Sequence, residues 1–148
     1  MSAVFVLNGP NLNLLGTREP EIYGTATLVE IEAAARTHGA AAGLEVEFRQ
    51  TNHEGVLIDW VQEAGQKGAA IIINPGAYTH TSIALHDALK TVHTPKIELH
   101  LSNVHAREPF RRTSFVSPAV DAVIAGFGAD GYRLALDAMR RLIDKGRR

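Results

Sequence analysis

The stretch Ala3-Val4-Phe5-Val6-Leu7 is an unbroken apolar run near the start of the chain, and residues 69–73 (Ala-Ala-Ile-Ile-Ile) form a second one. Apolar runs of this length, rich in β-branched residues, are typical of strands that are buried on both faces. Such strands belong to parallel sheets whose two faces are covered by helices. The two runs therefore predict the centre of an α/β sheet.

Helical patterns alternate with strand-like runs along the rest of the sequence. Three more strands are expected at residues 44–49, 96–101 and 120–125. Helices are expected at 28–42 (N-cap Thr27, with Glu30 at the third position), at 56–67, from Thr81 or Ser82 to Val92, and at about 130–145. This alternation predicts a single domain, residues 1–148, with a flavodoxin-like, doubly wound parallel sheet of five strands and helices on both faces.

Composition excludes several classes of protein. Hydrophobic residues make up 45% and charged residues 21% of the chain, as in ordinary globular proteins, and the net charge of -1 gives no sign of nucleic-acid binding. The absence of cysteine excludes disulfides, thiolate nucleophiles and cysteine-based zinc sites, and it fits a reducing compartment. No apolar run approaches the ~20 residues of a membrane span, and the first run lacks the basic residues that precede a signal sequence. We therefore expect a cytoplasmic protein without a membrane partner.

Ligands of doubly wound sheets bind beyond the carboxyl ends of the strands, and polar segments converge on that edge here. One connection, residues 8–27, is far longer than a typical strand-to-helix loop, which indicates a functional role. Taken singly, each segment also fits turn chemistry or packing, and only their joint placement favours a site. The segments are Asn8 to Gly16, Arg18 to Gly24, Asn74 to Ser82, and the stretch that follows the fourth strand.

The fourth strand carries polar groups on one face. Glu98, His100 and Ser102 alternate with apolar residues, so their side chains point to the same side. Arg107 and Arg111 follow in the next loop, where guanidinium groups are suited to clamp a carboxylate. This pattern predicts acid–base chemistry on a small anionic substrate.

Residue types indicate the individual roles. A guanidinium such as that of Arg18 favours the phenolate form of a nearby tyrosine, here Tyr23, and a phenolate is a competent base for a carbon acid next to a carbonyl. His100 is suited to donate a proton, with Glu98 to orient it. Two amides, those of Asn11 and Asn74, are suited to hold a carbonyl oxygen or a water. The backbone N–H groups of Leu101 and Ser102 are suited to hold the substrate anion. The combination predicts proton abstraction followed by elimination.

Two further patterns in the sequence do not indicate a ligand site. Residues 126–131 match G-x-G-x-x-G, but the dinucleotide fingerprint belongs to the first βαβ unit, and here only one helix follows. His86 and His93 could share a helix face, but no metal-binding motif accompanies them. The remaining alternative to an enzyme is a flavodoxin-like phosphate or nucleotide binding module without catalysis, although no loop carries the P-loop pattern.

Together these motifs resemble those of the type II 3-dehydroquinate dehydratases, and the similarity extends over nearly the whole chain. Leu101 stands where isoleucine is common in that family. The motifs are Asn8-Gly9-Pro10-Asn11-Leu12, Arg18-Glu19-Pro20 with Tyr23-Gly24, Asn74-Pro75-Gly76 with His80-Thr81-Ser82, Glu98 with His100, and residues 102–108 with Phe110-Arg111.

The resemblance implies a reaction and a role for each residue. Water is removed from 3-dehydroquinate to give 3-dehydroshikimate, by anti elimination through an enol or enolate, without cofactor or metal. Tyr23 would take the proton, Arg18 would assist it, His100 would protonate the departing hydroxyl, and Asn11 would hold a water at the enolate oxygen. Substrate would be bound by Asn74, His80, Leu101, Ser102 and Arg111.

The resemblance also implies an assembly. Asp87 would act across a subunit contact in a homo-oligomer, a dodecamer built from trimers, and residues 16–24 would form a mobile lid. The sequence leaves open whether the enzyme serves aromatic biosynthesis or quinate breakdown.

Overall fold

The computed structural model describes residues 1–146 and contains a five-stranded sheet in which every pairing is parallel. The strand order is β2-β1-β3-β4-β5, which is the flavodoxin-like order. The fold predicted from the sequence is therefore confirmed. The strands are β1 Ser2–Asn8, β2 Leu44–Gln50, β3 Ala70–Asn74, β4 Lys96–His100 and β5 Ala122–Ala125.

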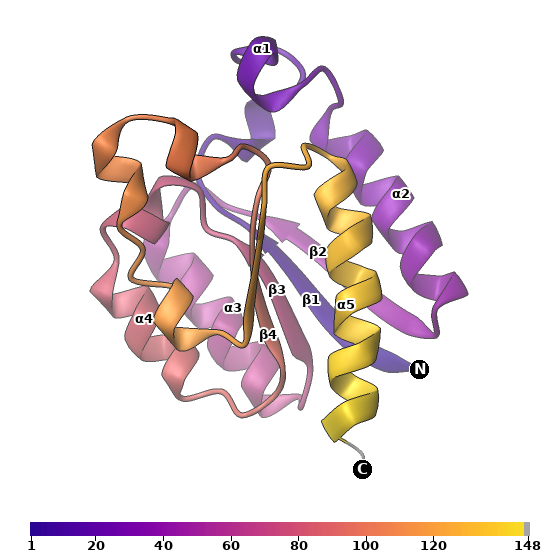
Figure 1. Cartoon of the computed structure of the whole chain (residues 1–148). Helices are drawn as coiled ribbons and strands as arrows, with labels where there is room; N and C mark the ends of the chain where they lie inside the picture. The colour runs from indigo at the N-terminus through magenta and orange to yellow at the C-terminus, as the bar shows by residue number, and fades with distance from the viewer. Residues whose placement is uncertain (147–148) are drawn as a thin grey trace.

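Helices cover both faces of the sheet (Figure 1). On one face lie α2 (Leu28–Ala41) and α5 (Asp130–Gly146), and on the other lie α3 (Glu54–Gln66) and α4 (Ile83–Lys90). Short turns of helix occupy the loops: α1 Pro20–Tyr23, η1 Leu12–Leu14, η2 Gly76–His80, η3 Val104–Ala106, η4 Pro109–Arg112 and η5 Ser117–Ala119.

The start signals of two helices act as predicted. Thr27 and Glu30 form a capping box, in which each side chain bonds the backbone N–H of the other residue. The Ser82 hydroxyl accepts a hydrogen bond from the backbone N–H of Leu85 at the start of α4.

Among residues 1–146, no helix combines the length and the apolar character that crossing a bilayer requires.

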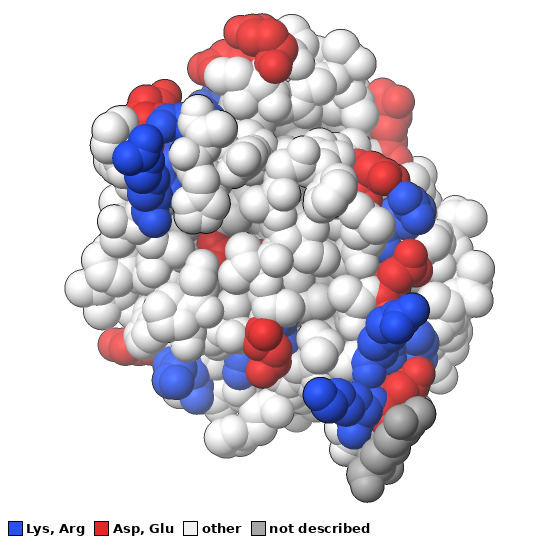
Figure 2. Space-filling model, viewed as in Figure 1, with Lys and Arg blue, Asp and Glu red and all other residues white. Residues whose placement is uncertain are grey.

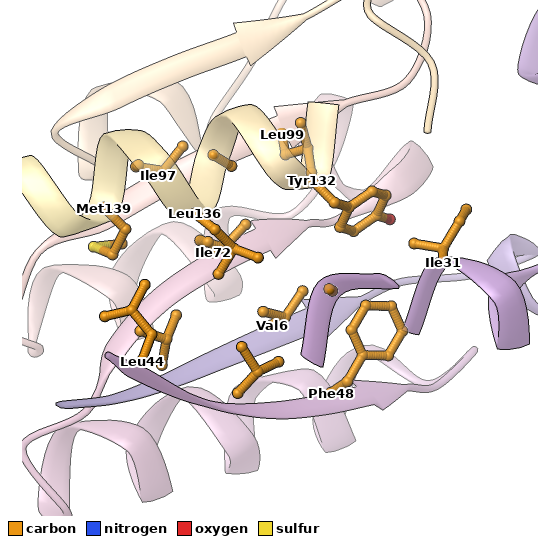
Figure 3. Packing of buried hydrophobic residues seen from close by; sticks show 14 of the residues in the cluster. Val6, Ile31, Leu44, Phe48, Ile72, Ile97, Leu99, Tyr132, Leu136 and Met139 are labelled. Carbon is orange, nitrogen blue, oxygen red and sulfur yellow. The ribbon is translucent and has the colours of Figure 1, made fainter. Parts of the chain in front are cut away.

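The sheet separates two apolar layers, and alternate residues of each central strand belong to different layers. Val6 and Ile72 pack under α2 and α5, where Figure 3 shows them beside Leu136. Leu7 and Ile73, the next residues along, pack on the opposite side under α3 and α4. Both faces of β1 and β3 are thus buried, which explains why their sequences are continuously apolar.

The glycine-rich stretch at residues 126–131 serves helix packing. A side chain at Gly131 would place its Cβ 2.9 Å from Cδ1 of the buried Leu99, so the Leu99 side chain would have to shift to admit it. Gly126 and Gly128 have positive φ angles in the preceding turn. A tight turn and close helix packing thus account for these glycines.

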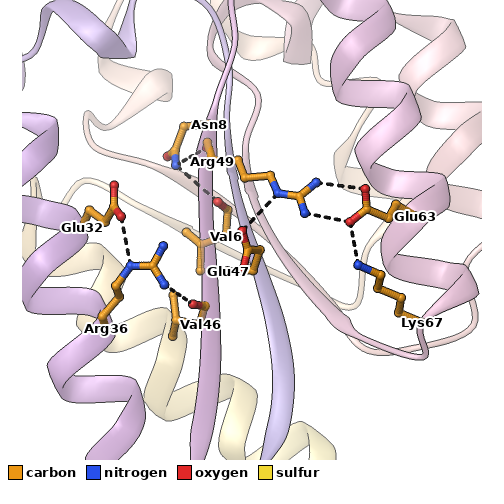
Figure 4. Close-up of polar contacts among 9 residues, drawn as sticks. All are labelled: Val6, Asn8, Glu32, Arg36, Val46, Glu47, Arg49, Glu63 and Lys67. Carbon is orange, nitrogen blue, oxygen red and sulfur yellow. Dashed lines mark hydrogen bonds and ion pairs between the residues drawn. The ribbon is translucent and has the colours of Figure 1, made fainter.

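A polar network ties β2 to α3 on the molecular surface (Figure 4). Arg49 donates two hydrogen bonds to Glu63, at 2.7 and 3.1 Å, and Glu63 also accepts one from Lys67 at 3.1 Å. The pKa of Glu63 is lowered to about 2, first by the hydrogen bonds from Arg49 and then by that from Lys67, although partial desolvation opposes this.

Several element boundaries differ from those predicted. β4 ends at His100, so Leu101 lies beyond the strand, and β5 begins at Ala122 because residues 117–119 form the turn η5. α4 ends at Lys90 rather than Val92, and α3 begins at Glu54, two residues earlier than predicted. The apolar side chains alone do not mark these ends, since Val92 and Leu101 are buried outside the regular elements.

Candidate active site

The sheet order reverses between β1 and β3, and the loops that leave these two strands meet at that point. The backbone N–H of Gly9 donates to the carbonyl of Asn74 at 2.8 Å. A Cβ at Gly9 would lie 2.5 Å from the Pro75 carbonyl oxygen, so the two loops touch backbone to backbone. The crevice at such a switch point is the usual ligand position of this fold class.

A small cavity opens at this edge, and it brings together most of the residues singled out from the sequence. The two predicted residues that do not line it are Glu98, which is buried behind His100, and Asp87, which is exposed on α4. The predicted residues that line the cavity are Asn11, Arg18, Tyr23, Asn74, His80, His100, Leu101, Ser102, Arg107 and Arg111.

Tyr23 lies between two guanidinium groups. The Cζ atom of Arg18 is 4.9 Å from the centroid of the Tyr23 ring, and that of Arg107 is 5.2 Å away. Arg107 is fixed in turn by a 3.0 Å hydrogen bond that it donates to the Ser102 hydroxyl. Two positive charges therefore lie close to the Tyr23 side chain.

Asn11 adopts a left-handed backbone conformation, with φ 69°, at the start of η1. Asparagine tolerates this region better than most residues, and non-glycine residues held there are concentrated at functional sites. The Asn11 N–H donates to Oδ1 of Asn52 at 3.0 Å, and the buried Leu12 anchors the next position. The loop is therefore held from both sides.

Asn74 is held by a buried polar chain that links β3 to β1 through α5. Its Nδ2 donates to the Tyr132 hydroxyl at 3.2 Å, and that hydroxyl donates to Oδ1 of Asn8 at 2.6 Å. Burial raises the pKa of Tyr132, so its hydroxyl remains a donor. The chain fixes the orientation of the Asn74 amide at the cavity wall.

His100 and Glu98 form a buried pair on one face of β4. Nε2 of His100 lies 2.5 Å from Oε2 of Glu98, whose exposed fraction is 1%. Burial raises the pKa of Glu98, but the hydrogen bond and charge of His100, with hydrogen bonds from Ser117 and Thr79, outweigh it and leave that pKa below its ordinary value.

The ionised state of Glu98 determines which ring nitrogen of His100 carries a proton. A carboxylate only accepts hydrogen bonds, so Nε2 of His100 carries a proton. The other ring nitrogen, Nδ1, makes no hydrogen bond within residues 1–146, and His100 lines the cavity. A protonated His100 therefore has its second N–H available to a bound molecule.

Two further cationic or titratable side chains complete the wall. Nδ1 of His80 donates to the Thr113 carbonyl at 2.7 Å, and the His80 ring stacks on that of His100 with centroids 6.4 Å apart. Nε of Arg111 donates to Glu108 at 2.5 Å, and this hydrogen bond holds the pKa of Glu108 below its usual range.

Charge is unevenly distributed on the face that Figure 2 shows. Lys and Arg side chains lie over the segment between β4 and β5, orange in Figure 1, and along α5, in each place with acidic side chains beside them. The first of these groups includes the loop that brings Arg107 and Arg111 to the cavity. Guanidinium groups at a cavity wall favour an anionic ligand.

Comparison with known proteins agrees with this geometry. Residues 2–140 match the model of the family described as dehydroquinase class II. The chain belongs to this family. It is therefore an enzyme, a hydro-lyase, as the sequence predicted.

Individual relatives match the class II dehydroquinase chain over most of its length. It is 63% identical to the 3-dehydroquinate dehydratase of Chelativorans sp. (strain BNC1), over 92% of this chain and 94% of that one. It is 57% identical to the 3-dehydroquinate dehydratase of Sinorhizobium medicae (strain WSM419), over 97% of each. The crystal structure of type II dehydroquinase from Propionibacterium acnes superposes with a TM-score of 0.93 at 45% identity, covering 95% of this chain and 97% of that one.

Four residues at this dehydroquinase site were not singled out from the sequence. Asn52 holds Asn11, and the hydroxyls of Thr79, Ser114 and Ser117 surround Glu98. The signal for the hydroxyls was indirect: a carboxylate at a buried strand position requires donors from elsewhere in the chain. Which serine or threonine supplies them depends on loop paths that strand and helix patterns do not specify.

Proposed function

We propose that this class II dehydroquinase removes water from 3-dehydroquinate to give 3-dehydroshikimate, with Tyr23 as the base and His100 as the acid. The observation that carries the proposal is that one cavity holds both a tyrosine between two guanidinium groups and a histidine backed by a buried carboxylate. The names of the matching relatives supply the substrate.

In the first step, the Tyr23 phenolate removes the proton on the carbon next to the substrate ketone. The C–H electron pair moves toward the carbonyl oxygen, which becomes an enolate. The Cζ atoms of Arg18 and Arg107 lie 4.9 and 5.2 Å from the centroid of the Tyr23 ring, so two cations accompany the base in this proposal. A water held at Asn11 would then stabilise the enolate oxygen.

In the second step, the enolate electrons form the new C=C bond and the C–O bond to the leaving hydroxyl breaks. His100 donates a proton from Nδ1 to this hydroxyl, so that it leaves as water. Glu98 stabilises the charged imidazole that precedes the transfer. An anti course requires base and acid to act on opposite faces of the substrate ring.

The remaining predicted residues would bind the substrate. The backbone of Leu101 and Ser102 and the side chain of Arg111 form an anion site, and Asn74 and His80 would bind its hydroxyl groups. Arg107, placed with the carboxylate clamp on sequence grounds, lies here between Ser102 and Tyr23, so it contributes to both the substrate and the base.

Activity of a His100→Ala variant tests the acid. General acid catalysis is worth about 10²–10⁴-fold, so kcat should fall by at least that order while the folded state is retained. Activity is followed as the rise in enone absorbance, in buffer with EDTA, since no metal step is proposed. Near-normal kcat would exclude His100 as the general acid, and no turnover of 3-dehydroquinate by the parent would contradict the proposed substrate.

Stereochemistry tests the elimination itself. Substrate deuterated at one or the other position of the carbon next to the ketone should lose deuterium from only one of them. Loss of the proton syn to the departing hydroxyl would contradict the proposed anti course.

We further propose that the chain assembles as a dodecamer built from trimers, with Asp87 completing the cavity of a neighbouring subunit. The outward face of α4 supports a subunit contact, because Asp87 is exposed and Ile83, one helical turn earlier, is 59% exposed. The cytoplasmic location stays a prediction, which cell fractionation would test.

A further inference from the structure

Three hydroxyl groups surround the buried carboxylate of Glu98. Thr79 donates to Oε2 at 2.8 Å and Ser114 donates to the same oxygen at 3.2 Å, while Ser117 donates to Oε1. They come from η2 and from the segment between η4 and β5, and Thr79 is 1% exposed. We call Thr79, Ser114 and Ser117 the hydroxyl cage.

The cage is matched to a negatively charged Glu98. The Ser114 oxygen already accepts the backbone N–H groups of Val116, at 3.1 Å, and of Ser117, at 2.9 Å. Its two acceptor positions are therefore used, and its only proton is committed to Glu98. A proton on Glu98 that pointed toward this hydroxyl would find no acceptor position left there.

The geometry points to the hydroxyl cage as a positioning device for the acid: Thr79, Ser114 and Ser117 hold Glu98 ionised and in register with Nε2 of His100, so that Nδ1 faces the cavity with its proton. This inference rests on the role proposed for His100. None of the three hydroxyls touches the substrate in this scheme, and they act only through Glu98 and His100.

The other charged and titratable side chains near Glu98 and His100 do not bond Glu98. The ring of His80 stacks on His100, and its Nδ1 bonds Thr113 rather than Glu98. The other titratable or charged side chains at the cavity are Arg18, Tyr23, Arg107 and Arg111, and no contact joins any of them to Glu98 within residues 1–146. The hydroxyls and His100 are thus the direct partners of this carboxylate.

Thr79→Val and Ser117→Ala test the inference, because each removes one hydroxyl of the cage and leaves the other two in place. We expect kcat to fall about tenfold or more, the effect of losing a hydrogen bond to a charged group, with KM changed less than about threefold. Thr79→Ser keeps the hydroxyl and should restore kcat. Thr94→Val is the matched control, since its hydroxyl bonds the Ala69 carbonyl at the opposite end of the sheet.

A spectroscopic measurement separates this inference from the proposed function. In protein labelled with ¹⁵N-histidine, the Nε2 proton of His100 should give a far-downfield signal, assigned by its loss in His100→Ala. The signal should weaken or shift in Thr79→Val and Ser117→Ala and persist in Thr79→Ser and Thr94→Val. An unchanged signal and unchanged kcat in both cage variants, or equal losses in Thr94→Val, would overturn the inference. If the signal of the parent responded to the cage variants but His100→Ala were fully active, only the proposed role of His100 as the acid would be overturned.

Discussion

At the scale of single residues, the surroundings of Tyr23 combine a local and a distant contact. Arg18 is five positions away on the same loop, whereas Arg107 follows β4 and reaches the ring from a different part of the chain. The five-residue spacing indicated the first pair from the sequence. The second depended on how the loop after β4 folds back, and the sequence suggested only a carboxylate clamp for Arg107.

Tyr23→Phe removes the oxygen that takes the proton but keeps the ring between the two guanidinium groups. We expect turnover to be lost while a carboxylate inhibitor still binds, because the anion site at Ser102 and Arg111 is untouched. Assays of product formation and inhibitor titration by calorimetry measure the two effects separately. If the variant turned over within tenfold of the parent, another residue would be the base, and His80 would be the next candidate.

Arg18→Ala leaves Tyr23 in place but removes one of its two cations. Tyrosine side chains ionise near pH ~10 in model peptides, so weaker stabilisation of the phenolate leaves less base at neutral pH. We expect residual activity that climbs toward high pH, and Arg18→Lys should lie between the variant and the parent because a point charge lacks the planar guanidinium. Single-turnover kinetics at saturating substrate separate chemistry from binding. A pH profile parallel to that of the parent would contradict the role of Arg18.

At the scale of elements, α5 is joined to the active edge of the sheet by one tyrosine. Tyr132 packs against Phe48 with ring centroids 5.9 Å apart, and its hydroxyl links Asn74 on β3 to Asn8 on β1. The buried helix face was visible in the sequence as helical periodicity. The polar link was not, because a tyrosine on that face is indistinguishable by pattern from a purely apolar contact.

Tyr132→Phe keeps the packed ring and removes the link. Two buried amides would lose a partner, so the free energy of unfolding should fall by about 1–3 kcal/mol. Tyr78→Phe is the matched control, because the Tyr78 hydroxyl bonds Asn52 at an exposed position where water can replace it. Urea unfolding measures both variants. Equal losses of unfolding free energy in the two variants would mean that burial of the Tyr132 hydroxyl does not strengthen its contribution to stability.

Glu63 gives β2 and α3 a pH-dependent connection. Its pKa in the folded protein is about 2, against 4.5 for the ordinary side chain, so its stabilising effect is complete above the ordinary value and declines as pH falls toward 2. Glu63→Gln should therefore lower stability at pH 7 and by clearly less at pH 3. Urea midpoints at the two pH values test this, with Glu32→Gln, which breaks an exposed pair with Arg36, as control. A difference that stayed constant with pH would contradict the assignment to Glu63.

The elements were predictable where one physical cause dominates, and the loops were not. Continuous apolar runs marked β1 and β3 because both of their faces are buried, and the Thr27–Glu30 pair marked the start of α2. The loops after β1 and β4 contain turns of helix, among them α1 with Tyr23, whose ends depend on contacts with other loops. The edge of the sheet on which the site lies could be predicted from the topology. The hydroxyl cage could not, because its position depends on the paths of the loops.

At the scale of the whole molecule, a single chain leaves the cavity without Asp87. This side chain is exposed on α4, outside the cavity of its own chain, and Ile83 beside it leaves an apolar surface open. If the proposed role is correct, each working site takes Tyr23 from one subunit and Asp87 from a neighbour.

A mixed assembly tests this arrangement directly. Tyr23→Phe and Asp87→Asn should each be inactive as pure oligomers, because every site then lacks one of the two groups. After unfolding and refolding in a 1:1 mixture, about a quarter of the sites should combine an intact Tyr23 with an intact Asp87 from the neighbour, given random assembly into a symmetric oligomer. Activity should rise accordingly, and light scattering should give the mass of a dodecamer, or of a trimer if the trimer stands alone. A mixture no more active than its components would place both residues in the same subunit's site, and an active monomer would contradict the assembly altogether.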